Sequence, residues 1–186
     1  MTEGLTEVRF HGRGGQGAWT ASLLLAQAGL REQRHIQSFP AFGPERAGAP
    51  ITAFTRISDG PIYIHSSVYE PDVVVVLDPT LLGPTVVQGV KRTSKIVVNT
   101  NQSPGELKEG LGLGEVEAWV LDATSLALKV LGRPITNTAM LGVVVKATGM
   151  VKLESLFEVV KERFPGRIGE MNIELVKTAY EEAVKG

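Results

Sequence analysis

Three glycines with a defined spacing lie close to the N-terminus, in the segment His11-Gly12-Arg13-Gly14-Gly15-Gln16-Gly17. They fit the pattern G-x-G-x-x-G, which turns a strand sharply into a helix and directs backbone N–H groups at an anion. An apolar strand ending at Val8–Phe10 precedes them, and an alanine-rich helix from Ala18 follows. We therefore expect a functional turn here, with these candidate anion- or cofactor-binding residues: Gly12, Arg13, Gly14, Gly15, Gln16 and Gly17.

Three interpretations of this turn remain open. A dinucleotide site requires an acidic residue about 20 positions on, at the end of the second strand. The strand predicted over His35–Phe39 runs into Pro40 without one, since Glu32 precedes it and Glu45 lies well beyond it. The glycines could instead serve only close helix–strand packing. The third interpretation is another contact at the helix N-terminus, with a phosphate, a carboxylate or a partner chain.

A second segment, from Ser38 to Pro50, combines two aromatic residues, an adjacent acid–base pair and three prolines. Stiff loops lose less entropy on docking, and Phe and Arg are enriched in the buried centres of protein interfaces. The alternative is an ordinary surface loop whose aromatic residues pack into the core. We expect an interface made by Phe39, Phe42, Pro44, Glu45 and Arg46.

Composition excludes several classes of protein. The 186 residues predict one domain, and the near balance of 19 Lys+Arg against 20 Asp+Glu argues against a nucleic-acid groove. The sequence contains no cysteine, which excludes a disulfide, a thiolate nucleophile and a cysteine-ligated iron–sulfur cluster. Three scattered histidines make a zinc site improbable. Without a leader or a long apolar run, we expect a cytoplasmic chain that does not bind membranes.

Alternating strand-like and helix-like segments predict an α/β fold of three Rossmann-like layers, a largely parallel sheet with helices on both faces. Val73–Leu77, a run of branched apolar residues, indicates a strand buried on both faces. Asp59-Gly60 predicts a turn joining Ile51–Ile57 to Ile62–Ile64 in a small antiparallel excursion. The other predicted strands are Lys95–Asn99 and Ala118–Leu121, and helices are expected at Thr124–Leu131, Asn137–Thr148, Leu153–Phe164 and Glu170–Val184.

Polar side chains follow three of these strands. In an open α/β sheet, ligands and partners gather at the carboxyl ends of the strands, where Asp78, Asn99 and Asp122 would lie with the glycine turn. Each has a simpler explanation as well. Aspartate commonly caps the turn or helix that follows it, and Asn99-Thr100-Asn101 is typical of a turn.

Taken in order, these motifs resemble the gamma subunit of pyruvate:ferredoxin oxidoreductase. The resemblance rests on the glycine segment, on Phe39-Pro40-x-Phe42-Gly43-Pro44-Glu45-Arg46-x-Gly48-Ala49-Pro50, and on three later stretches. It extends from Val8 to about Phe164. The later stretches are Ala53-Phe54-x-Arg56-Ile57, Glu70-Pro71-Asp72-Val73-Val74-Val75-Val76-Leu77-Asp78 and Asn137-Thr138-x-Met140-Leu141-Gly142.

The resemblance implies a division of labour among several chains. In that family thiamine diphosphate with Mg²⁺ decarboxylates a 2-oxoacid, [4Fe-4S] clusters pass electrons to ferredoxin, and coenzyme A takes the acyl group. These cofactors belong to partner subunits of alpha, beta and delta type, so this chain would hold no cofactor or metal. Its residues 1–186 would form one gamma-type domain, helical from about residue 137, in a cytoplasmic complex of anaerobic metabolism that makes acetyl-CoA.

The isolated chain is accordingly expected to be inactive, because it also lacks the Gly-Asp-Gly and Asn-Asn signature of thiamine diphosphate sites. Its role would be assembly, with coenzyme A contact by Arg13 and Arg46 as a further hypothesis. Pyruvate is the expected oxoacid, although Ala47 stands where the family often has a bulkier or basic residue. The alternative is a free-standing nucleotide-binding oxidoreductase domain.

Overall fold

The computed structural model describes residues 4–41 and 48–186. Their strands form one sheet in the order β2-β3-β1-β4-β5-β6-β7. Four central strands are parallel, and a β2–β3 pair flanks them on one side and β7 on the other, all antiparallel to their neighbours. The strands are β1 (Thr6–Arg13), β2 (His35–Pro40), β3 (Pro50–Ser58), β4 (Val73–Val76), β5 (Lys95–Asn99), β6 (Glu117–Leu121) and β7 (Val184–Lys185).

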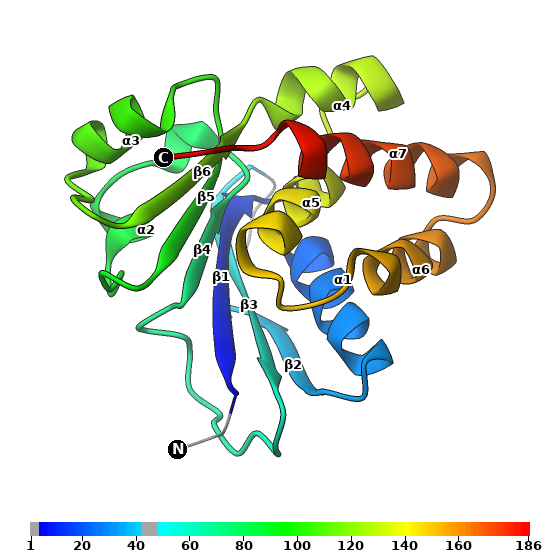
Figure 1. Ribbon diagram of the computed structural model, residues 1–186, viewed down its shortest axis with the longest axis horizontal. Coiled ribbons are helices and arrows are strands. Elements are labelled where there is room, and N and C mark those ends of the chain that lie inside the picture. The colour runs from blue at the N-terminus through cyan, green and yellow to red at the C-terminus, as the bar shows by residue number, and fades with distance from the viewer. Residues whose placement is uncertain (1–3, 42–47) are drawn as a thin grey trace.

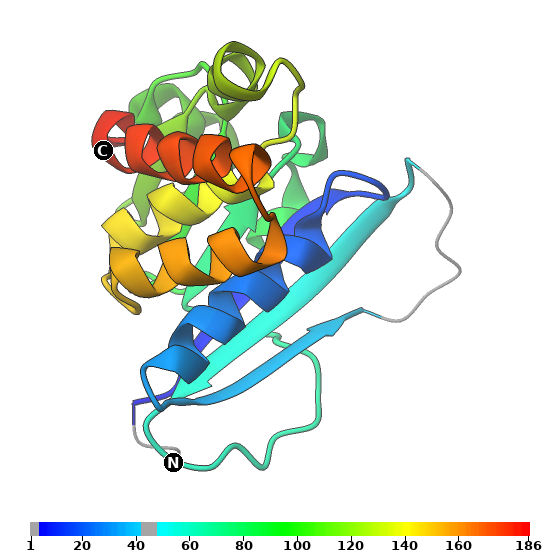
Figure 2. The same ribbon diagram turned by 90° about the vertical axis from the view of Figure 1, so that its right-hand side faces the viewer.

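Helices cover both faces of this sheet, as the three-layer prediction requires (Figure 1). One face carries α1 (Ala18–Arg31), α5 (Asn137–Thr148), α6 (Leu153–Arg163) and α7 (Arg167–Glu182). The other carries the short α2 (Pro84–Val87) and α3 (Pro104–Leu111), and α4 (Ala123–Leu131) packs on α7. A 3₁₀ turn, η1, spans Pro79–Leu81. Figure 2 shows α1 lying along β3 and β2, with β2 as the outer strand.

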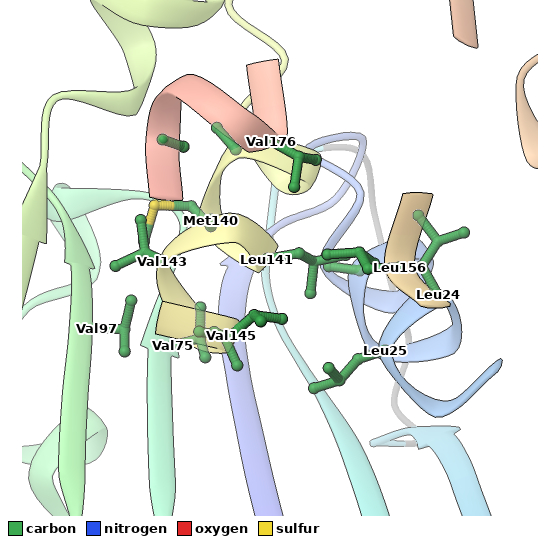
Figure 3. Close-up of a cluster of buried hydrophobic side chains, with 14 of the residues drawn as sticks. Leu24, Leu25, Val75, Val97, Met140, Leu141, Val143, Val145, Leu156 and Val176 are labelled. Carbon is green, nitrogen blue, oxygen red and sulfur yellow. The ribbon is translucent and has the colours of Figure 1, made fainter. Parts of the chain in front are cut away.

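The run of valines in β4 places side chains in both layers, which confirms a strand buried on both faces. Val73 and Val75 belong to the apolar cluster beneath α1 and α5, whereas Val74 and Val76 belong to the cluster beneath α2 and α3. Figure 3 shows the larger cluster, in which α5 lies between the sheet and the outer helices. A Cβ at Gly142 would lie 2.4 Å from the carbonyl oxygen of Val176, so glycine permits the close approach of α5 to α7.

The predicted hairpin between Ile51–Ile57 and Ile62–Ile64 is wrong. β3 pairs with β1 on one side and with β2 on the other, so both of its edges are already hydrogen-bonded. The segment after Gly60 instead crosses the sheet as a strap, residues 60–70, outside any strand. Buried Arg56 holds this strap by donating to the carbonyl oxygens of Ile64 (3.3 Å) and Ser66 (2.8 Å).

The last predicted helix also needs correction. α7 begins at Arg167 and ends at Glu182, and Val184 belongs to β7 rather than to the helix. Gly186 extends the pairing, because its N–H donates to the carbonyl oxygen of Ala118 (2.9 Å) and its own carbonyl accepts from the Ala118 N–H (3.0 Å). The final residues thus cover the edge of β6. Among the described helices, none has the length and apolar character needed to span a membrane.

Candidate functional site

The glycine segment forms a compact turn between β1 and α1. β1 continues through Gly12 to Arg13, and α1 starts after Gly17, whose backbone is left-handed with φ 79°. A Cβ at Gly17 would lie 2.5 Å from Nδ2 of Asn137, at the start of α5. This position therefore requires glycine both for its backbone conformation and for the close approach of α5.

Gln16 folds its side chain back over the turn. Its Oε1 accepts from the backbone N–H of Arg13 (2.7 Å), and its own N–H donates to the Arg13 carbonyl (3.0 Å). A Cβ at Gly12 would meet the Cβ of Ala18 at 3.1 Å and the Oε1 of Gln16 at 3.6 Å. Close packing against the chain's own atoms therefore explains why glycine is needed at positions 12 and 17, whereas a Cβ at Gly15 would lie in open space.

Asp78, at the carboxyl end of β4, joins the turn to the sheet. Its Oδ2 accepts from Arg13 Nε (3.1 Å) and from Gln16 Nε2 (2.8 Å). Its Oδ1 accepts from the Thr80 N–H (2.9 Å) and the Thr80 hydroxyl (2.7 Å). Burial alone would raise the pKa of this carboxyl, but hydrogen bonds from Thr80 and Gln16 and the charge of Arg13 together lower it. Asp78 is thus an ionised carboxylate whose acceptor positions are filled.

Arg13 connects the same network to the second distinctive loop. Besides Asp78, it donates from Nη2 to the Thr80 hydroxyl (2.8 Å) and from Nη1 to the Gly48 carbonyl (3.2 Å). The backbone repeats this connection, since Gly14 N–H donates to Ala49 O (2.9 Å) and Gly48 N–H donates to Gly14 O (3.2 Å). The glycine turn therefore holds the C-terminal end of the Ser38–Pro50 loop. The neighbouring strands β1 and β4 connect to helices on opposite faces of the sheet, and such a place is called a topological switch point. We therefore call Arg13, Gln16, Asp78 and Thr80 the switch-point network.

The other predicted loop residues divide into two groups. Phe39 lies within β2, where its ring is 5.1 Å from that of Phe54 and 5.4 Å from the Arg56 guanidinium carbon. It is thus partly buried against the chain's own side chains. The predicted interface residues Phe42, Pro44, Glu45 and Arg46 lie outside the described residues.

His11 is buried within the sheet and takes no part in the switch-point network. It accepts a hydrogen bond on Nε2 from Arg9 Nε (3.0 Å), and Arg9 also donates to the carbonyls of Val86 (2.9 Å) and Gln88 (2.6 Å). Burial, reinforced by the charge of Arg9, lowers the pKa of His11 to about 4. This pair fixes α2 to the sheet. Arg9 was not among the residues predicted from the sequence, although alternation along β1 places residues 9 and 11 on the same face.

Two adjoining hollows open at the carboxyl ends of β5 and β6. Their volumes are about 720 and 460 Å³, and both are lined by Thr100, Asn101, Gln102, Asp122 and Ser125. Several of the polar groups at their rims already serve the local structure. Asp122 caps α4 by accepting from Ser125 N–H (2.9 Å), as its simpler explanation predicted, and Asn99 Nδ2 donates to Leu77 O (2.9 Å).

A helix cap that was not predicted from the sequence forms one wall of the larger hollow. Ser103 and Glu106 cap α3 reciprocally in a capping box. The signal was present in the sequence as Ser, two intervening residues and Glu.

The chemistry of these groups is structural. The carboxylate of Asp78 is saturated, Arg13 is paired, and His11 is buried and neutral at physiological pH. Residues 4–41 and 48–186 contain no group of three or more His, Cys, Asp or Glu side chains placed to hold a metal ion. Over the same residues, the site described above offers hydrogen-bonding surfaces rather than an activated nucleophile or base.

Comparison with known proteins gives consistent matches. Residues 7–182 match the family described as pyruvate ferredoxin/flavodoxin oxidoreductase. The chain is 53% identical over 178 residues to the "Pyruvate/ketoisovalerate oxidoreductases common subunit gamma" of Pyrococcus furiosus, covering 95% of this chain and 96% of that one. It is 47% identical over 182 residues to "Pyruvate synthase subunit PorC" of Methanothermobacter thermautotrophicus, covering 97% of each.

The fold agrees with a solved relative. The crystal structure of pyruvate oxidoreductase subunit PORC from Thermotoga maritima superposes with a TM-score of 0.90 at 37% identity, covering 99% of each chain.

Proposed function

The chain belongs to the pyruvate ferredoxin/flavodoxin oxidoreductase family as a gamma-type subunit, and we propose that it acts in its complex as an assembly subunit whose switch-point network holds a docking loop. The enzyme concerned oxidatively decarboxylates a 2-oxoacid to acyl-CoA and reduces ferredoxin. Its partners are the alpha-, beta- and delta-type chains of the same complex.

One observation supports assembly above all. Arg13, the cation within the glycine turn, is hydrogen-bonded to Asp78, Thr80 and the Gly48 carbonyl, although its side chain stays about one third exposed (35%). A paired guanidinium presents a weaker field to an anion than a free one, and this guanidinium holds the backbone at Gly48 in place. The geometry therefore favours a shaped protein surface at this turn over an independent anion site.

The cofactors fit partner chains better than this one. Its sequence contains no cysteine to ligate an iron–sulfur cluster, and it lacks the residue pattern that holds thiamine diphosphate and Mg²⁺. We place thiamine diphosphate, Mg²⁺ and the [4Fe-4S] clusters in the partner subunits. The whole chain would then serve as one gamma-type domain of a cytoplasmic, anaerobic hetero-oligomer, inactive when isolated.

Substrate choice would also rest with the partners. The Pyrococcus furiosus relative is named a subunit common to pyruvate and ketoisovalerate oxidoreductases, so one gamma chain serves two oxoacids there. Pyruvate is our proposed substrate for this complex, because relatives named pyruvate synthase subunits match the full chain.

Contact with coenzyme A is a second proposal for the same loops. It is supported by the unfilled space beside Gly15 at the N-terminal end of α1, where a phosphate would be favoured. Arg13 would have to share its hydrogen bonds with such a phosphate.

The first experiment isolates the native complex under anaerobic conditions through a tag on this chain. We expect iron, thiamine and other subunits to copurify, together with oxoacid-dependent dye reduction. A homo-oligomer without these components would contradict the assembly role and favour a free-standing nucleotide-binding domain.

The second experiment separates docking from ligand contact. Arg13→Ala is compared with Arg92→Ala in the reconstituted complex, because Arg92 is an exposed cation just before β5, at the opposite end of the parallel strands. Loss of copurifying subunits in Arg13→Ala alone supports docking. Intact assembly with a raised KM for coenzyme A supports ligand contact, and unchanged assembly and kinetics would contradict both proposals.

A further inference from the structure

β2 is an edge strand without formal charge, and within residues 4–41 and 48–186 no other strand pairs with its outer edge. Such edges attract further strands unless a charge, a bulge or a central proline blocks them. Ile36, Gln37, Ser38 and Phe39 contain none of these, and Pro40 comes only at the end. The exposed side of α1 and the strap of residues 60–70 lie beside this edge, and together the three form a candidate interface.

The hydrogen-bond register shows which groups face outward. Ala41 N–H donates to Thr52 O (2.8 Å), so residues 35, 37 and 39 also lie in the pairs hydrogen-bonded to β3. Ile36 and Ser38 therefore direct their N–H and C=O groups away from the sheet. Pro40 faces outward as well and contributes only a carbonyl.

α1 places an apolar stripe beside this edge. Trp19, Leu23 and Leu30 are 53%, 37% and 58% exposed and recur on one side of the helix. On the opposite sides, the helix contacts β2 and β3, as the Ser22–Ser38 hydroxyl pair (2.8 Å) shows, and α6 through Arg31 and Glu158. The stripe thus faces away from both of these contacts, toward solvent. The helix that carries it lies beside β2, the outer strand of the sheet (Figure 2).

We propose that a second copy of this chain pairs with the β2 edge through a two-fold axis at Gln37, forming a continuous sheet across two gamma chains. An antiparallel strand pairs with itself only in registers that place outward residues opposite outward residues. With Gln37 opposite its counterpart, Ile36 and Ser38 of each copy exchange four backbone hydrogen bonds. A two-fold axis at Ser38 would instead place Pro40 opposite the partner's Ile36, with the proline ring against the Ile36 carbonyl.

The helices fit the same arrangement. α1 lies over β2 and β3, so two α1 helices would approach to about 10 Å, the usual distance for packed helices. Gly29 packs over Ile36 while Ser22 contacts Ser38, which places the axis near the middle of α1. Leu23 of one copy then meets the partner's Leu30, with no formal charge at the centre.

The opposite face of the edge also has room for a partner. A cavity of about 300 Å³ is lined by Gln37, Ser38, Phe39, Ile64 and His65, beneath the strap. In this register the partner's His35 lies opposite Phe39, on the face where that cavity opens. The side chain of the partner's His35 would therefore enter this cavity.

Cysteine cross-linking tests the register directly, because the chain has no cysteine of its own. We expect Gln37→Cys to form an intermolecular disulfide under mild oxidation, since opposite non-hydrogen-bonded residues are at disulfide distance. His35→Cys is the matched control on the same strand and face, because its two copies would lie about 13 Å apart. Both variants are examined in the isolated full chain and in the assembled complex.

Light scattering of the full chain gives the second measurement, with twice the 19.9 kDa monomer mass expected. Leu30→Lys should weaken the dimer at least 100-fold, whereas Leu128→Lys, at an exposed leucine of α4, should leave it unchanged. Equal cross-linking of Gln37→Cys and His35→Cys would overturn the proposal. A monomeric chain at all concentrations would do the same, as would cross-linking of Gln37→Cys only to a different subunit. These results are independent of copurification with cofactor-bearing chains, which tests the assembly role.

Discussion

Two crevices lie at the carboxyl ends of the parallel strands, each between strands that lead to helices on opposite faces of the sheet. Side chains fill one of them and leave the other open. At β1 and β4, the side chains of the switch-point network occupy the space above the strands. At β5 and β6, two hollows of about 720 and 460 Å³ remain open, although polar residues surround them. Helices leave to opposite faces in both places, so topology alone creates a crevice that the chain can either close with its own side chains or leave open.

This difference changes how the glycine motif is interpreted. The motif lies at the closed crevice, where Asp78 neutralises Arg13 and Gln16 covers the turn. The open hollows carry no recognisable motif, and their acidic residue Asp122 serves as a helix cap. A phosphate-binding motif in sequence therefore predicts the turn correctly without establishing a ligand.

Asp78→Ala should give the largest loss of stability. It removes four hydrogen bonds and leaves Arg13 without its carboxylate in a partly buried site, which should cost about 3 kcal/mol. Denaturant unfolding measures the change. A loss below about 1 kcal/mol would show that the network adds little to stability.

Gly17→Ala should follow, at about 2 kcal/mol, because it combines a positive φ with a contact against Asn137. Gly15→Ala is the matched control. Its φ is also positive, at 94°, but a Cβ there meets nothing within 4 Å, so we expect about 1 kcal/mol. Thermal or denaturant unfolding of both variants measures strain and contact separately, and equal losses would refute the packing role of Gly17.

His11→Asn should remove a pH dependence rather than a fixed amount of stability. Because the pKa of His11 is about 4 in the folded protein and about 6.5 when unfolded, the unfolded state binds the proton first. The wild type should lose about 2 kcal/mol between pH 7 and pH 5, and the variant should lose much less. Parallel curves from unfolding titrations over this range would show that His11 ionises normally.

Asp122→Ala, at the open crevice, should have the smallest effect. It removes one helix cap, for which about 1 kcal/mol is expected. Chemical denaturation of Asp122→Ala and Asp78→Ala in parallel gives the ratio of the two losses in free energy of unfolding. Equal losses would abolish the distinction between the closed and open crevices.

Local patterns predicted the elements that depend on neighbouring residues. The valines of β4, the turn before α1 and the cap at Asp122 follow from composition and spacing within a few positions. The pairing of β3 with β1 and β2 was missed because a strand's partners are chosen over long separations. β7 was missed because two residues form a strand only where β6 offers an uncovered edge.

The site was predicted in its residues but not in its bonding. The sequence pointed to Arg13, Gln16 and Asp78 separately, and the fold brings them together across a separation of about 65 positions. No local sequence pattern indicates that Asp78, rather than a bound ligand, neutralises the charge of Arg13. The hollows could not be predicted, because they arise from the paths of loops after β5 and β6.

The most direct test of the account is assembly of the complex with Asp78→Ala or Asp122→Ala in this chain, measured by the iron, thiamine and partner subunits that copurify with it. We predict that Asp78→Ala loses most of these components while Asp122→Ala retains them. Full assembly with Asp78→Ala, at a temperature where that variant is folded, would contradict the claim that the switch-point network serves docking.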